Sequence, residues 1–174
     1  AILFWVMVLC AQSGLSQSKY EGDGLYSLQG VTEGSEAFQE ILDSLGPFEL
    51  EIVSGNMMKI YRNKNNGVSF TMNKRKRVNS PGEAFILSEM TLSLGLTNGY
   101  YTGELPLDIF TIITQKEQLQ IMKSKSDVEI MKNRSGKGYI ALKYTGYKNA
   151  RLSGPLSISL SYIDDRLYQL VIGH

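Results

Sequence analysis

Two segments of this chain alternate apolar and polar residues so regularly that they restrict the fold to a sheet with one buried face. Between Val68 and Asn73 every second residue is apolar, and between Leu156 and Tyr162 the apolar residues alternate strictly with serines. Successive side chains of a strand point to opposite faces, so each of these strands buries one face only. Antiparallel sheets accept this arrangement. We therefore expect an antiparallel sheet with one covered and one uncovered face.

Two further segments predict helices that cover such a sheet. The apolar residues of the first recur at i, i+3, i+4 and i+7 and share one stripe, formed by Phe38, Ile41, Leu42 and Leu45. Thr32 or Ser35 can cap its N-terminus, and Gly46 supplies its exit. The second helix begins at Thr114, which forms a capping-box pattern with Glu117 three residues later.

The order of the predicted elements indicates an α+β protein built from two units. Beyond the alternating segments, strands are predicted at 57–62, 84–87, 91–97, 139–144 and 167–172. Residues 19–30 are expected to form a leader or a first short strand, 123–137 a loop, and 164–165 a turn. The predicted fold is two diverged helix-plus-antiparallel-sheet repeats, 19–99 and 100–174, with about three strands each and with the helices packed on one sheet face.

The first eighteen residues have the layout of a secretory signal peptide. Ala1 to Ala11 is an apolar run, and small and polar residues follow it. Eleven residues are too few to cross a bilayer, which needs about 20 in a helix. We therefore expect cleavage near Ser16 and a secreted or periplasmic product. In an alternative, Cys10 carries a lipid.

The composition is poor in the residues on which most enzymes rely. The chain has 1 His, which is its last printed residue, and 1 Cys, which lies in the predicted signal peptide. General bases are most often His, and zinc sites need clusters of His and Cys. The sequence also has no glycine-rich phosphate loop that precedes a helix. We therefore expect no catalytic residue, no metal site, no cofactor and no enzymatic activity.

The charges are segregated along the chain although the net charge is only +1. The segment from Glu21 to Glu51 has eight acidic residues and no basic ones, and the segment from Lys59 to Arg77 has seven basic residues and no acidic ones. Such segments can attract each other within one fold or attract charged partners. The run Lys74–Arg77 lacks the interleaved aromatic residues that stack on bases, so nucleic acid is not an expected partner.

Several short motifs resemble a known family. The order Leu45-Gly46-Pro47, then Tyr61, then the segment 66–70, is similar to the SmpA/OmlA (BamE) family of outer-membrane-assembly lipoproteins. Two such units in tandem also resemble the architecture of the secreted β-lactamase inhibitor protein. The segment 101–106 resembles the linker that opens a second unit. The resemblance covers most of 31–172 and implies a tandem α+β fold, although the second helix is followed by 123–125 without a Leu-Gly-Pro motif.

These observations favour a secreted or periplasmic non-enzymatic module that binds another protein. The alternative is a structural or assembly factor of the cell envelope that acts at a membrane, in which case an anionic envelope surface is the partner. Tyrosine and arginine are enriched at protein interfaces. The candidate binding residues, expected on the uncovered sheet face or beside it, are Tyr61, Tyr139, Tyr144, Tyr162, Lys59, Arg62, Lys74, Arg75, Lys76 and Arg77.

Overall fold

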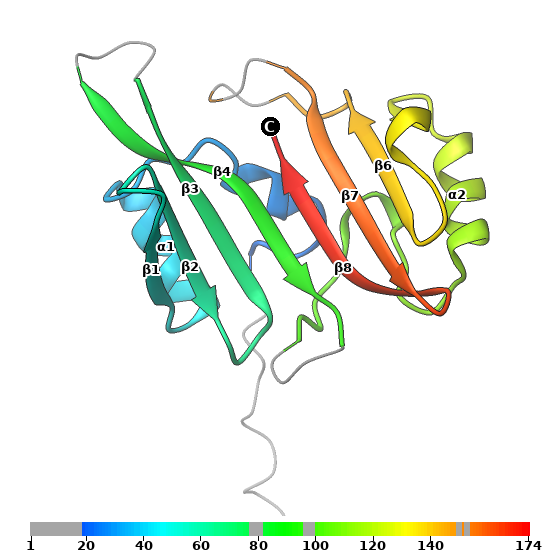
Figure 1. The fold of residues 1–174 in the computed structure, drawn as a ribbon, viewed down its shortest axis with the longest axis horizontal. Helices are drawn as coiled ribbons and strands as arrows, with labels where there is room; N and C mark the ends of the chain where they lie inside the picture. Colours follow the sequence, from blue (N-terminus) through cyan, green and yellow to red (C-terminus); the bar gives the residue numbers. More distant parts are fainter. Residues whose placement is uncertain (1–18, 77–81, 96–99, 149–150, 152–153) are drawn as a thin grey trace, which may run out of the picture.

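A computed structural model describes residues 19–76, 82–95, 100–148, 151 and 154–174 (Figure 1). The predicted signal peptide, 1–18, lies outside the described residues, so its cleavage near Ser16 stays a prediction. In the described ranges no helix is both long enough and apolar enough to cross a membrane.

The described strands form one eight-stranded antiparallel sheet with the order β1-β2-β3-β4-β8-β7-β6-β5. β4 pairs with β8, and this pairing joins the first four strands to the last four. The strands are β1 (Glu49–Val53), β2 (Met58–Asn63), β3 (Val68–Lys76), β4 (Glu83–Ser93), β5 (Val128–Ile130), β6 (Tyr139–Tyr144), β7 (Leu156–Ile163) and β8 (Arg166–Gly173).

Helical segments precede the strands in each half of the chain. The 3-10 helix η1 (Gly22–Leu28) and the α-helix α1 (Glu36–Leu45) come before β1, and η2 (Pro106–Asp108) and α2 (Gln115–Ser124) come before β5, with the short η3 (Lys132–Arg134) after it. The predicted caps are confirmed. The Ser35 side chain accepts a hydrogen bond from the Phe38 backbone, Gly46 ends α1 with φ 90°, and Thr114 and Glu117 form a reciprocal capping box.

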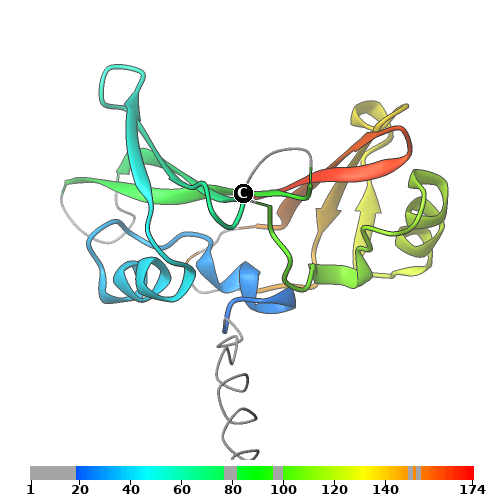
Figure 2. The same cartoon turned by 90° about the horizontal axis from the view of Figure 1, so that it is seen from below.

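The core lies between the helical segments and one face of the sheet. The register aligns buried side chains in a row across the central strands, in the order Phe70, Met90, Ile172, Ile158 and Leu142. Phe38 and Ile41 of α1, Tyr26 of η1 and Met122 of α2 belong to the same buried cluster. Figure 2 shows η1 and α1 together on one side of the curved sheet. The helical segments therefore share the covered face.

The α+β class, the antiparallel sheet and the two helices are confirmed, and three local predictions are wrong. Residues 22–28 form a 3-10 helix rather than a strand, and 84–87 and 91–93 belong to the single strand β4. The segment 123–137 contains β5 and η3 and is not a plain loop. β1 was not predicted, although its first four residues alternate between Glu and an apolar residue; four of its five residues are exposed.

Candidate protein-binding surface

The second face of the sheet, which we call the bare face, carries seven short hydroxyl side chains among the fifteen residues of its three central rows. Within the described residues no helix packs on it (Figures 1 and 2). The pairing register defines two adjacent rows across the central strands. The first row is Arg62, Ser69, Thr91, Val171, Ser159 and Ala141, and the second is Ser93, Gln169, Ser161 and Tyr139. A third row continues the pattern with Thr71, Glu89, Gly173, Ser157 and Lys143.

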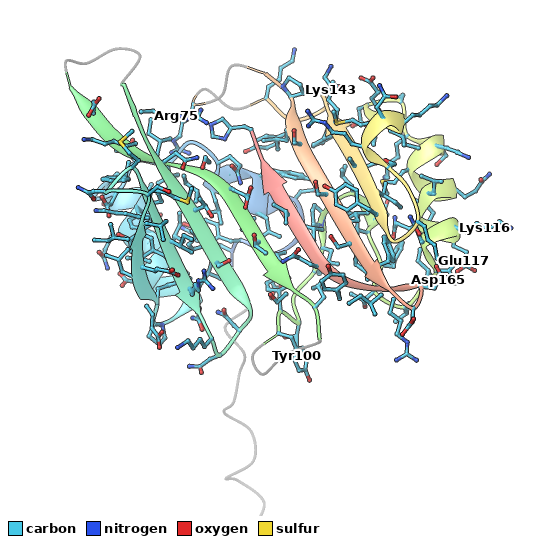
Figure 3. All side chains as sticks on the ribbon, viewed as in Figure 1. Arg75, Tyr100, Lys116, Glu117, Lys143 and Asp165 are labelled. Atoms are coloured by element: carbon cyan, nitrogen blue, oxygen red, sulfur yellow. The ribbon has the colours of Figure 1, made fainter. Side chains whose placement is uncertain are left out.

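The first two rows of the bare face are uncharged from β3 to β6, whereas the third row contains the exposed Glu89 of β4. The Tyr139 hydroxyl donates a hydrogen bond to Ser159 Oγ at 2.7 Å, which holds the tyrosine ring across its neighbouring strand. Figure 3 shows the cations Arg75 and Lys143 toward one end of the strands, and Tyr100 and Asp165 toward the opposite end. Arg62 forms an exposed ion pair with Glu51 at 3.0 Å. A partner would therefore meet hydroxyl groups in the two central rows, the Glu89 carboxylate beside them and further charges at the rim.

The expectation that four strand tyrosines share the uncovered face is wrong for three of them. Tyr61 lies on the covered face, where its ring packs against Phe38 of α1 with centroids 5.1 Å apart. Tyr144 also faces the covered side and packs against Tyr26, again at 5.1 Å. Tyr162 is buried in the core. Only Tyr139, among these four, lies on the bare face.

Lys59 and Tyr61 instead belong to a half-buried cluster at the border of the covered face. Lys59 Nζ lies 2.7 Å from both carboxylate oxygens of Glu33 and 4.3 Å from the centroid of the Phe85 ring. The Tyr61 hydroxyl donates a hydrogen bond to the same carboxylate. Burial raises the pKa of Tyr61, and the Glu33 charge acts in the same direction. These groups satisfy one another, so the cluster ties β2 to the chain before α1.

The basic run splits between the two faces. Lys74 forms an ion pair with Glu83 at 2.8 Å on the neighbouring strand. Arg75 is opposite Ala84 and is exposed on the bare face. Lys76 ends β3; its side chain and the whole of Arg77 lie outside the described part of the chain. The structure therefore places one cation of this run on the bare face, and a role in binding for the run stays a prediction.

The described part of the chain has no cluster of side chains suited to bind a metal ion. No group of three or more His, Cys, Asp or Glu side chains there is arranged to hold a metal ion. The tightly packed phenols are structural: burial raises the pKa of Tyr26 and of Tyr162, and both hydroxyls are buried without a hydrogen-bond partner. Because burial favours the neutral phenol, these two hydroxyl groups are poorly suited to donate a proton to a ligand.

The serines and threonines of the bare face were missed as candidate residues although the sequence carried the signal. The polar members of the alternating segments, such as Ser69, Thr71 and Ser159, are necessarily on the face opposite the core. Tyrosines were predicted in their place because tyrosine is enriched at protein interfaces. The polar–apolar alternation therefore predicted which residues lie on the bare face better than the choice of tyrosine residues did.

Comparison of the chain with protein-family models, with curated proteins and with solved structures finds no match. The resemblance to the SmpA/OmlA (BamE) family and to the β-lactamase inhibitor protein therefore stays a prediction from short motifs.

Proposed function

We propose that this chain is a secreted or periplasmic, non-enzymatic module that binds another protein through its bare face. The observation that carries the proposal is the continuous row of hydroxyl and small side chains across β3, β4, β8, β7 and β6. The export part of the proposal rests on the signal-peptide pattern of 1–18.

Short hydroxyl side chains suit a docking surface for an energetic reason. Ordering a rotamer-rich side chain at an interface costs about 0.5–1.5 kcal/mol, and serine and threonine have few rotamers to lose. Serine and tyrosine together also supply adaptable hydrogen bonds and rigid contact area, as in antibody paratopes. Tyr139, held by Ser159, is the one large aromatic side chain in the two central rows and is the proposed anchor.

We also propose that the two halves of the chain, 19–99 and 100–174, are diverged copies of one unit. In the described residues, each half has one α-helix followed by four strands, and the halves meet edge to edge where β4 pairs with β8. In the strand order the second half runs as the reverse of the first, as a pseudo-twofold arrangement requires. A duplicated unit that extends its sheet gives the wide bare face that the binding proposal needs.

Site-specific photocrosslinking tests the binding proposal. A photoreactive phenylalanine analogue is introduced at Ser159 on the bare face, or at Gln120 as a control, because Gln120 is exposed on α2. The protein is expressed with its export segment in a bacterial host and irradiated in the extract that contains its partners. We expect a discrete crosslinked protein from position 159 and none from 120. Equal crosslinking from both positions, or none from 159, contradicts the proposal.

A further inference from the structure

The first strand of the sheet has an open edge. Within the described residues, β1 pairs with β2 on one side, and no strand pairs with it on the other. β1 forms the left border of the sheet in Figure 1. An unpaired edge presents backbone N–H and C=O groups that can accept another strand, and many proteins blunt such edges with lysine, proline or a bulge. The five residues of β1 contain neither lysine nor proline.

Apolar side chains are exposed along this edge. Leu50 is 49% exposed and Ile52 is 56% exposed, although the register places both on the covered face, opposite Tyr61 and Lys59. α1 packs on β2 through the contact between Phe38 and Tyr61 and leaves these two side chains half in solvent. Large apolar residues gathered in this way mark interaction sites more often than isolated ones do.

A hollow beside the edge continues the apolar surface. It lies between the C-terminal end of α1 and the start of β1, and its volume is about 370 Å³. Leu42, Phe48 and Tyr61 line it together with Gly46, Pro47 and Asp43. Since Tyr61 is opposite Leu50, the hollow and the exposed apolar side chains are neighbours on the same face.

The outermost charges of the edge strand are the carboxylates of Glu49 and Glu51, and the cations that pair with them, Arg62 and Lys64, lie in β2 and in the turn after it. Glu49 and Glu51 alternate with Leu50 and Ile52 and therefore point to the bare face, where each pairs with a cation but stays more than half exposed. Asp43 at the hollow receives a hydrogen bond from Gln39 and takes part in no ion pair among the described residues. An added strand would therefore meet apolar groups on one face and carboxylates on the other.

We propose that β1 is a second binding site, which adds an extended segment of another protein as a ninth strand. The segment that fits has alternating residues: apolar ones beside Leu50 and Ile52, and basic ones beside Glu49 and Glu51. Main-chain hydrogen bonds supply affinity and alternate side chains supply specificity in this mode of recognition. A second copy of the chain fits less well, because antiparallel pairing of β1 with itself centred on Glu51 sets like charges opposite each other. This site is distinct from the bare face and does not depend on it.

A designed peptide tests the proposal on the full chain. The probe is a fluorescent acetyl-Lys-Val-Lys-Val-Lys-Val-Lys-amide, and its matched control has the same residues in two blocks, four lysines and then three valines. Binding is followed by fluorescence anisotropy. The variant Ile52→Lys places a cation in the apolar row, and Met57→Lys is its control, because Met57 is 53% exposed but lies outside β1 in the hairpin turn. Circular dichroism melts check that both variants stay folded.

We expect the alternating peptide to bind at least about 10-fold more tightly than the blocked one, which corresponds to about 1.4 kcal/mol. Ile52→Lys should weaken it about 10-fold or more, and Met57→Lys less than 2-fold. Equal binding of the two peptides shows charge attraction alone and overturns the proposal, as does absence of binding. Sedimentation of the chain alone gives a further decision: a dimer that Ile52→Lys dissociates shows that a second copy occupies the edge, which also overturns it. If the proposed binding through the bare face proves wrong, the expected peptide-binding and sedimentation results stay the same.

Discussion

Replacing Ile41 with alanine tests how α1 is anchored. The Ile41 side chain is fully buried between α1 and the sheet. The change removes three carbons, and at about 0.8 kcal/mol for each buried methylene the lost transfer free energy is about 2.4 kcal/mol. The remaining cavity adds about 24 cal/mol per Å³, which brings a partly relaxed site to about 3–4 kcal/mol. Leu42→Ala is the matched control, because Leu42 is next in sequence and only half-buried at the open hollow.

Urea unfolding, followed by circular dichroism, measures both variants. We expect a free energy of unfolding lower by about 3–4 kcal/mol for Ile41→Ala and by about 1 kcal/mol for Leu42→Ala, where water and neighbouring side chains can fill the space. Equal losses for the two variants would refute the reasoning, because the helix would then be rotated about its axis relative to the described packing. A loss below about 1 kcal/mol at Ile41 would show that α1 is peripheral.

Three further changes test separate parts of the fold. Tyr26→Phe removes a buried hydroxyl without a partner and should raise the free energy of unfolding by about 1 kcal/mol. Burial raises the pKa of Tyr26 above its ordinary value near 10, so the stability of the wild type should fall as the pH rises above about 10. The Tyr26→Phe variant should lose less stability in that pH range. A destabilised Tyr26→Phe protein would mean that the hydroxyl has a partner. Thr114→Ala breaks the capping box and should cost about 1 kcal/mol in urea melts, and an unchanged midpoint would contradict the cap. Gly67→Ala should cost more than about 2 kcal/mol, because Gly67 has φ 69° and an added Cβ would lie 2.7 Å from the Tyr100 backbone; a neutral effect in the same assay would contradict that turn geometry.

The helices and the strongly alternating strands were predictable because single local signals define them. The capping box at Thr114 and the apolar stripe of α1 each place a boundary or a face without any tertiary information. The same holds for the serine alternation of β7, since each residue of a strand faces opposite to the next.

The facing of the candidate tyrosines was not predictable in the same way. In β2 the apolar Met58 and Ile60 lie on the bare face, whereas Lys59 and Tyr61 lie on the covered face, and β6 has a continuous apolar run from Tyr139 to Leu142. In neither strand does the pattern of apolar residues show which parity is buried. The buried parity depends on tertiary contacts. Tyr61 lies on the covered face because it packs against Phe38 of α1, and this contact cannot be predicted from the residues of β2 alone.

The strand β1 was missed for a related reason. Its residues stand at the border of the sheet, where burial is slight, and the alternation Glu-Leu-Glu-Ile spans four residues, which is the shortest run that indicates a strand. Edge strands depend on pairing with their neighbour more than on burial, and pairing is a property of the whole sheet.

The affinity of the crosslinked partner for bare-face variants tests the central proposal most directly. Isothermal titration compares Ser159→Arg, in the middle of the bare face, with Gln120→Arg on the outer face of α2, and both variants add the same charge to an accessible position. Binding through the bare face predicts that Ser159→Arg weakens the partner about 30-fold or more, or about 2 kcal/mol, while Gln120→Arg stays within 2-fold of the wild type. Equal affinity of the wild type and Ser159→Arg, with both proteins folded, would contradict binding through this face.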